Sequence, residues 1–305
     1  MTDVTPDIDG LVIIDKPEHM TSAGVVSRVK QILKAKKVGH TGTLDPFATG
    51  VLICCLNRAT RLARFLLGGE KKYQALLHLG IETDTQDATG KIISEQQPAA
   101  KTETEIKAAF RTFQGTMAQV PPTYSALKHQ GVPLYKHARR GKPIQKPARQ
   151  IVIYDLHILE VRWPFIRFET TCSAGTYIRT LGADIGRALG CGGHLKALRR
   201  IENAGFSISA AMTLPQLEMC ADSPELKHCT VGMAAALKDM PAKQADSALA
   251  QKITKGAPLT DKDIVRAELD SRSKFVKIVA SDGALLAVIE RNTKQDTYQY
   301  CCVFN

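Results

Sequence analysis

The pattern of hydrophobic and polar positions along the chain predicts a mixture of strands and helices. Short apolar runs rich in β-branched residues, ended by proline, glycine or charged residues, are typical of buried strands. Such runs occupy residues 11–17, 50–56, 73–79, 151–163 and 166–172. Apolar residues at helical spacing predict helices over residues 21–37, 60–67, 102–113 and 177–190.

Capping and glycine signals support these helices. Thr21 or Ser22 can cap the first helix, and Thr102 with Glu105 has the pattern of a capping box. In the last helix, Gly182 and Gly186 are one turn apart. Because glycine has no side chain, this spacing predicts that another element approaches that helix closely.

Residues 115–150 show little periodicity and contain several prolines. We expect a long excursion loop with one short helix. Loops beyond about 15 residues in compact proteins tend to be functional or disordered. This segment is therefore a candidate functional loop.

The order of the elements predicts the fold class. Strands and helices follow one another without a regular βαβ rhythm, which favours an α+β fold with a mixed, largely antiparallel sheet and flanking helices. From about Met240 the pattern changes to a linker, one short helix and short strands over residues 264–304, with turn signals at 270–273 and 282–283. We expect two domains, residues 1–240 and a small β-rich domain of residues 241–305.

Composition excludes several classes of protein. The 305 residues are 44% hydrophobic, as expected of a globular chain, and no apolar run approaches the roughly 20 residues that span a bilayer. The polar, acidic start is unlike a signal or transit peptide, so we expect a cytoplasmic protein. The eight cysteines form no CxxC pair and no HExxH is present, which predicts reduced thiols and no metal site.

The charge points to a polyanionic partner. The chain carries 41 Lys and Arg against 30 Asp and Glu, a net charge of +11. Between residues 127 and 150 there are seven basic residues and no acid, and further basic clusters lie at 30–37, 58–64 and 196–200. A single run of this kind is commonly just a solvated surface, but four clusters favour nucleic acid, whose phosphates Lys and Arg neutralise.

The most unusual candidate for chemistry is Asp45 in the stretch GHTGTLDPFATG. Asp-Pro also favours a turn by itself, so a structural and a catalytic role are both open. Tyr73 alone could be a strand aromatic, and Arg179 alone a surface arginine. The chain has neither GxxxxGK[ST] nor a GxGxxG after a strand, which removes the main support for an ATPase or a dinucleotide-binding enzyme.

Four long motifs, taken together, favour the catalytic interpretation of these residues. GHTGTLDPFATGVL, KKYQALLHLGIETDTQDATG, PPTYSALKHQGVPLYKHAR and GTYIRTLGADIG occur at residues 39–52, 71–90, 121–139 and 175–186. In order and wording they resemble the tRNA pseudouridine-55 synthase family, the TruB type, over roughly residues 9–215. The resemblance implies an enzyme that isomerises a uridine in the T arm of tRNA with an aspartate and without cofactor or metal. It implies tRNA as the partner and no protein partner, and we expect a monomer.

The resemblance also assigns residues. It implies catalytic roles for Asp45, for Tyr73, which would stack on the target base, and for Arg179, which would pair with the aspartate. It implies substrate contacts by His40, Tyr177 and Leu198. Residues 121–150 match the RNA-gripping loop of the family, with backbone contacts expected from Lys128, Lys136, Arg139, Arg140 and Lys142. The C-terminal part is similar to a PUA domain, an RNA-binding β-barrel, mainly through ALAQKITKGAPL.

The residue types suit this reaction. Moving the ribose C1′ bond from N1 to C5 of uracil needs no redox partner, and one carboxylate can stabilise the electron-poor sugar or attack either the sugar or the base. One suffices because no water is activated. A guanidinium from Arg179 would keep Asp45 ionised, and stacking of the flipped base on Tyr73 is worth about 1–3 kcal/mol. Tyr73 is also a candidate acceptor for the C5 proton.

Three other functions stay open at this point. A non-catalytic RNA-binding or RNA-chaperone protein would bind tRNA without chemistry. A guide-RNA-dependent relative would act only inside a ribonucleoprotein. A glycosidase-like hydrolase would release free uracil.

Overall fold

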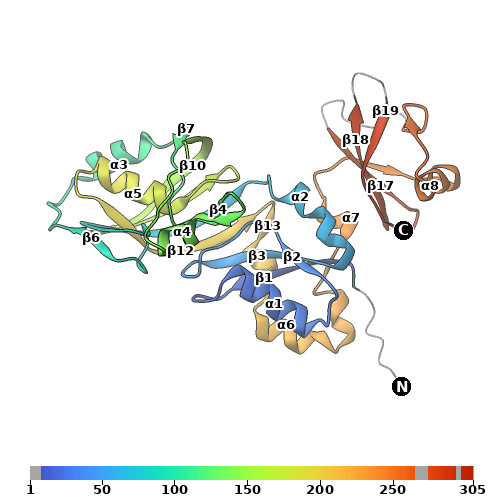
Figure 1. Cartoon of the computed structure of the whole chain (residues 1–305), viewed down its shortest axis with the longest axis horizontal. Helices are drawn as coiled ribbons and strands as arrows, with labels where there is room; N and C mark the ends of the chain where they lie inside the picture. Colours follow the sequence, from blue (N-terminus) through green and yellow to red (C-terminus); the bar gives the residue numbers. More distant parts are fainter. Residues whose placement is uncertain (1–7, 265–273, 293–296, 305) are drawn as a thin grey trace.

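The computed structural model describes residues 8–264, 274–292 and 297–304. Figure 1 shows a large sheet flanked by helices, with a second, smaller sheet formed by the C-terminal part of the chain. The described helices are α1 (Ser22–Ile32), α2 (Ala63–Leu66), α3 (Glu103–Arg111), α4 (Leu134–Arg139), α5 (Ile178–Ala188), α6 (Leu214–Ala221), α7 (Met233–Ala236) and α8 (Ser247–Thr254), with 3-10 turns η1 (Asn57–Leu62), η2 (Ile208–Ala210) and η3 (Pro224–Lys227).

The large sheet is mixed and largely antiparallel, which confirms the predicted fold class. Its main path is β14-β1-β3-β12-β4-β11-β10-β7, with β13 beside β12 and β2 beside β3. Among these strands only the β3–β12 pair is parallel. Their bounds are β1 (Gly10–Lys16), β2 (Val38–His40), β3 (Thr49–Leu56), β4 (Lys71–Leu79), β7 (Gly115–Gln119), β10 (Arg149–Arg162), β11 (Phe165–Cys172), β12 (Gly193–Asn203), β13 (Phe206–Ser207) and β14 (Val231–Gly232).

Two small hairpins lie outside the sheets. They are formed by β5 (Ile81–Thr83) with β6 (Ile92–Glu95), and by β8 (Lys128–His129) with β9 (Val132–Pro133). The second hairpin and α4 lie within the predicted excursion loop. The loop prediction was wrong at the start of this segment, because β7 pairs with β10 at the edge of the large sheet.

The predicted strands and helices are present, with two differences. The helix expected over residues 60–67 is the 3-10 turn η1 followed by the short α2. Strand β12 was not predicted, although it lies between β3 and β4 in the middle of the large sheet. Thr21 is the N-cap of α1, and the Thr102–Glu105 capping box of α3 is formed as predicted.

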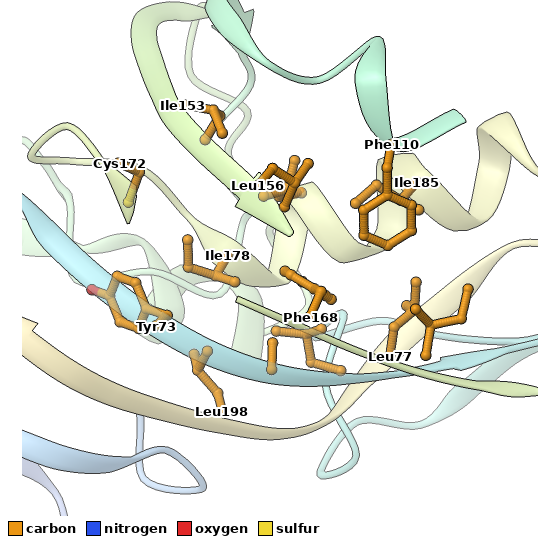
Figure 2. Packing of buried hydrophobic residues seen from close by; sticks show 14 of the residues in the cluster. Tyr73, Leu77, Phe110, Ile153, Leu156, Phe168, Cys172, Ile178, Ile185 and Leu198 are labelled. Carbon is orange, nitrogen blue, oxygen red and sulfur yellow. The ribbon is translucent and has the colours of Figure 1, made fainter. Parts of the chain in front are cut away.

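Helix α5 packs closely against β12, as its glycines predicted. A Cβ atom on Gly182 would lie 2.7 Å from the Leu195 side chain, and one on Gly186 would lie 2.5 Å from the Gly192 backbone. Figure 2 shows part of the core between sheet and helices, where Tyr73, Ile178 and Leu198 are neighbours of Phe168. The first turn of α5 is thereby fixed against the centre of the sheet.

The C-terminal sheet has the order β15-β17-β18-β19-β16. Its strands are β15 (Ala242–Gln244), β16 (Leu259–Thr260), β17 (Phe275–Val279), β18 (Leu285–Asn292) and β19 (Thr297–Val303). The turn predicted at 282–283 is present, and the turn predicted at 270–273 lies outside the described residues. The sheet packs on α2 and η1: the rings of Phe65 and Phe275 are 5.2 Å apart, edge to face, and Arg61 lies 5.1 Å from the ring of the buried Phe304.

Within the described ranges, no helix has the length and apolar character needed to cross a membrane. All eight cysteines are free thiols, and five of them are buried.

Candidate functional site

The loop that carries Asp45 connects β2 to β3 and is held at both sides. The Ser22 hydroxyl, at the start of α1, accepts from the Leu44 N–H at 2.8 Å and donates to the Leu44 carbonyl at 3.0 Å. The buried Lys16 ammonium donates to the carbonyls of Pro17, Met20 and Pro46. Burial lowers the pKa of Lys16 to about 8, although the nearby Asp45 opposes this shift. These contacts fix the backbone on either side of Asp45.

Asp45 and Arg179 form a two-point ion pair. Arg179 Nε lies 2.8 Å from one carboxylate oxygen and Nη2 lies 3.2 Å from the other. The Arg179 side chain is only 3% exposed, whereas that of Asp45 is 35% exposed. Arg179 also donates to the carbonyls of Thr85 and Tyr124 and lies 3.5 Å from the Asp87 carboxylate. Arg179 is therefore held by buried partners on one side, and on the other side it binds the partly exposed Asp45 carboxylate.

Asp45 faces a cavity of about 300 Å³. Five of the six residues to which the family resemblance assigned catalysis or substrate contact line it: Asp45, Tyr73, Tyr177, Arg179 and Leu198. Tyr73 and Leu198 are 6% exposed and neighbours in the core (Figure 2). Burial raises the pKa of the Tyr73 hydroxyl, while the nearby Arg200 opposes this shift.

Tyr177 is positioned by contacts to its backbone. It is the N-cap residue of α5, and its N–H and C=O pair with the amide of the buried Gln119 at 2.8 and 3.0 Å. The Arg149 guanidinium lies 4.8 Å from the Tyr177 ring centre. The aromatic ring at the cavity wall is thus stacked against a cation.

His40 lies in a neighbouring cavity rather than in the same one. This second cavity, of about 380 Å³, shares Asp45 and Arg179 with the first. In the described part of the chain, His40 Nδ1 is buried without a hydrogen-bond partner. Burial, with a smaller effect from Arg200, lowers the pKa of the His40 ring. The imidazole therefore takes up a proton less readily than an ordinary histidine.

The five basic residues expected to contact RNA backbone are all exposed. Of these, Arg139 lines the second cavity. The other four, Lys128, Lys136, Arg140 and Lys142, lie on the surface of the β8–β9 hairpin and around α4, and line neither cavity. They form a basic surface beside the site, not part of its interior.

Sequence reasoning missed two buried cations in the first cavity, Lys71 and Arg200. Arg200 is opposite Tyr73 in the β12–β4 ladder, and Lys71 is two residues before Tyr73, so the period of a strand places Lys71 and Tyr73 on one face. The strand pattern of KKYQALLHL could have predicted that Lys71 lies on the same, inward face of the strand as Tyr73. Arg200 was noted only as part of the basic cluster at residues 196–200, and its place in the cavity was missed because β12 was not predicted.

No group of three or more His, Cys, Asp or Glu among the residues the structure describes is arranged to hold a metal ion.

Comparison with known proteins gives matches over most of the chain. Residues 30–178 match the TruB family pseudouridylate synthase N-terminal domain, and residues 179–238 match the tRNA pseudouridylate synthase B C-terminal domain. The chain is 41% identical over 283 residues to tRNA pseudouridine synthase B of Syntrophotalea carbinolica, covering 92% of this chain and 91% of that one. It is 37% identical over 288 residues to tRNA pseudouridine synthase B of Haemophilus influenzae, covering 93% and 90%.

Solved structures agree with these matches. The crystal structure of a Cbf5-Nop10-Gar1 complex is similar with a TM-score of 0.74 at 26% identity, over 97% of this chain and 85% of that chain. The archaeal box H/ACA sRNP Nop10-Cbf5 complex is similar with a TM-score of 0.74 at 27% identity, over 97% and 86%.

Proposed function

Because the chain belongs to the TruB family and is a pseudouridine synthase acting on tRNA, we propose that it isomerises the uridine at position 55, in the T arm, with Asp45 as the catalytic carboxylate. The observation that carries this proposal is the ion pair of Asp45 with the buried Arg179 at the wall of a cavity that also contains Tyr73. A carboxylate, a fixed guanidinium and an aromatic ring are the groups that the reaction needs.

The geometry supports a role for each of these residues. The base must leave its stack to reach the cavity, because Asp45 is only 35% exposed and Tyr73 is buried. Once there, the uracil stacks on Tyr73 and the ribose lies nearer the mouth, beside Asp45. Asp45 then meets the electron-poor C1′ as the C1′–N1 bond breaks. Arg179 keeps the carboxylate oriented through its two hydrogen bonds.

Tyr73 suits stacking better than proton transfer. Its raised pKa leaves scarcely any phenolate at neutral pH, and a neutral phenol is a weak base. We therefore assign the Tyr73 ring to holding the base. His40, in the adjoining cavity, is assigned to contact with the RNA next to the flipped nucleotide.

RNA binding is assigned to the exposed basic surface on residues 121–150 and to the C-terminal sheet. The exposed lysines and arginines of the segment match a phosphate backbone, which is where most of the affinity for nucleic acid arises. We propose residues 1–240 as the catalytic domain and residues 241–305 as a PUA-like RNA-binding domain.

We further propose that the chain works alone, as a monomer. The solved structures of its fold include protein complexes, whereas this chain carries its own basic surface beside the site. The non-catalytic alternative is disfavoured by the ion pair of Asp45 with Arg179. The hydrolase alternative is disfavoured because Asp45 is the one carboxylate among the described residues that line the cavity beside Tyr73.

The experiment is to treat unmodified tRNA transcript with the purified chain and to map pseudouridine at single-nucleotide resolution. A matched transcript carries cytidine at position 55. The proposal predicts pseudouridine at position 55 only, without added RNA or protein, and none in the matched transcript. Modification at another position, release of free uracil, or activity only with a guide RNA would contradict it.

A further inference from the structure

Two buried cations form part of the wall of the Asp45 cavity beside Tyr73. Lys71 is 7% exposed and Arg200 is 1% exposed. Arg200 Nη1 and Lys71 Cε both face Gly42, within 3.6 and 3.7 Å of where a side chain on that glycine would begin. The two cations therefore lie side by side. We call Lys71 and Arg200 the cationic floor.

The cationic floor is bonded mainly to backbone carbonyls, and Arg200 also interacts with the Tyr73 hydroxyl. Lys71 donates to the carbonyls of Leu67 and Gly69, and Arg200 to those of Val51, at 2.7 Å, and Gly42, at 3.0 Å. Among the described residues, no carboxylate lies within ion-pair distance of either cation. Arg179, by contrast, has both Asp45 and Asp87 beside it.

Neighbouring groups are affected by this uncompensated charge. Burial, together with a smaller repulsion from Arg200, lowers the pKa of Lys71 to about 8. Arg200 also opposes protonation of His40. Two unpaired buried charges of the same sign are costly for stability, so packing alone does not account for them. An anion placed against them would relieve that cost.

The depth of the cavity indicates which anion this is. The Asp45 side chain is 35% exposed, whereas Tyr73, Lys71 and Arg200 are buried, so solvent reaches the cavity from the Asp45 side. A phosphodiester is connected to the RNA chain on both sides and stays near the mouth. A flipped base stacked on Tyr73 reaches the floor. The group that meets Lys71 and Arg200 is therefore the uracil.

We propose that the cationic floor stabilises the negative charge that uracil acquires when its bond to ribose breaks. This inference rests on the function proposed above. As the C1′–N1 bond breaks, its electron pair stays on N1 and spreads to the carbonyl oxygens of uracil, while C1′ becomes electron-poor opposite Asp45. The base then turns, and an electron pair at C5 forms the bond to C1′. The C5 proton is lost to water and N1 takes up a proton from water, so that charge and protons balance.

Preorganised charges of this kind act in the transition state and little in the ground state. Removing one such group commonly lowers the rate by about 10²–10³-fold. We expect Lys71→Met to reduce the single-turnover rate on a T-arm stem-loop by about 10²-fold, with RNA affinity changed less than about threefold. Lys71→Arg keeps the charge and should recover at least a tenth of the missing rate.

The matched control is Lys238→Met. Lys238 donates to the backbone carbonyl of Gly205, as Lys71 donates to carbonyls, but it lines neither the Asp45 cavity nor its neighbour. This variant tests the effect of removing a carbonyl-bound lysine without touching the cavity. We expect the rate of Lys238→Met to stay within about threefold of the wild-type rate, because the hydrogen bond it removes does not change in the transition state.

The decisive readout is sensitivity to the leaving group. 5-Fluorouracil forms a more stable anion than uracil, so a stem-loop with 5-fluorouridine at the target depends less on the floor. Cleavage is followed as loss of intact 5-fluorouridine from nuclease digests. The loss of rate that Lys71→Met causes relative to the wild type should be at least tenfold smaller on this RNA than on the uridine RNA. Equal deficits on both RNAs, or no deficit on uridine, would overturn the proposal.

Asp45→Asn separates this outcome from the function itself. It should be inactive on both RNAs. If Asp45→Asn turned over uridine normally, the proposed function would be wrong. If Asp45→Asn were inactive and Lys71→Met lost the same factor in rate on both RNAs, only the role of the cationic floor would be refuted.

Discussion

Replacing Ser22 by alanine tests whether the loop that carries Asp45 must be held in place. The Ser22 hydroxyl is 2% exposed and makes two hydrogen bonds to the backbone of Leu44. Leaving a buried polar group unsatisfied costs about 1–3 kcal/mol. Since Leu44 borders a cavity that water can enter, we expect the low end for each of the two groups, a loss of about 2 kcal/mol in the free energy of unfolding.

The effect on catalysis should be larger than this stability loss suggests. A displacement of about 1 Å at a reacting group can cost about 10²-fold in rate, so we expect Ser22→Ala to slow single turnover by about 10–100-fold at saturating RNA. The control is Thr102→Ala, which removes the N-cap of the remote helix α3 at a cost of about 1 kcal/mol. Urea unfolding measures stability and quenched-flow assays measure the rate. A wild-type rate for Ser22→Ala, or an equal rate loss for Thr102→Ala, would refute the reasoning.

Further predictions concern charge and packing. Arg179→Met leaves Asp45 and the buried Asp87 without their cation, so it should lower the free energy of unfolding by about 3–5 kcal/mol and abolish turnover, while Arg179→Lys should restore part of the stability. The folded-state pKa of His40 lies below its ordinary value, so the unfolded chain binds the proton more readily than the folded chain. The free energy of unfolding therefore falls as the pH falls below about 6.5. The urea midpoints measured at pH 7.5 and pH 5.5 should differ less in His40→Asn than in the wild type. Glutamine should replace the four exposed basic residues that line neither cavity: Lys128, Lys136, Arg140 and Lys142. The rate at saturating RNA should stay unchanged, and the slope of log affinity against log salt should become less steep by up to about 0.9 for each phosphate that is no longer neutralised. An unchanged slope would contradict the assignment. Phe304→Ala should cost about 3–5 kcal/mol and split thermal unfolding into two transitions, because it removes the ring that packs the C-terminal sheet on η1; a single transition at an unchanged temperature would contradict this role.

Much of the fold could be predicted because most elements follow simple periodicities. Strand β1 contains the apolar run of residues 11–14 and ends just before Pro17, and α3 begins with a capping box. Strand β12 could not be predicted, because its sequence GHLKALRRIEN has charged residues in the middle of a central strand. The guanidinium of Arg200 reaches the carbonyls of Val51 and Gly42, which are distant in sequence, so the sequence gives no sign of these partners.

The pairing of β12 with β3 also depends on a glycine. Gly50 is directly beside Arg200, and a Cβ atom at Gly50 would lie 2.1 Å from the Arg200 carbonyl oxygen. Gly50 also has a φ of +102°, which other residues rarely adopt. Sequence alone marks this glycine as a turn or strand residue, but not as the place where two strands touch.

The site was partly predictable for a similar reason. Asp45, Tyr73 and Arg179 belong to long motifs, and the structure places all three around one cavity. Lys16 and Asp87 escaped notice because isolated lysines and aspartates are usually surface residues. Their burial follows from backbone carbonyls and from Arg179, which only the folded chain brings within reach.

The central claim is that the Asp45 carboxylate itself carries out the chemistry. The most direct measurement is the single-turnover rate of Asp45→Asn on a T-arm stem-loop at saturating RNA, with affinity measured in parallel. The asparagine side chain would keep the shape of the aspartate but not its charge. We predict no detectable pseudouridine with RNA affinity within about threefold of the wild type, because the phosphate contacts lie elsewhere. Turnover by this variant at a rate near that of the wild type would contradict the account.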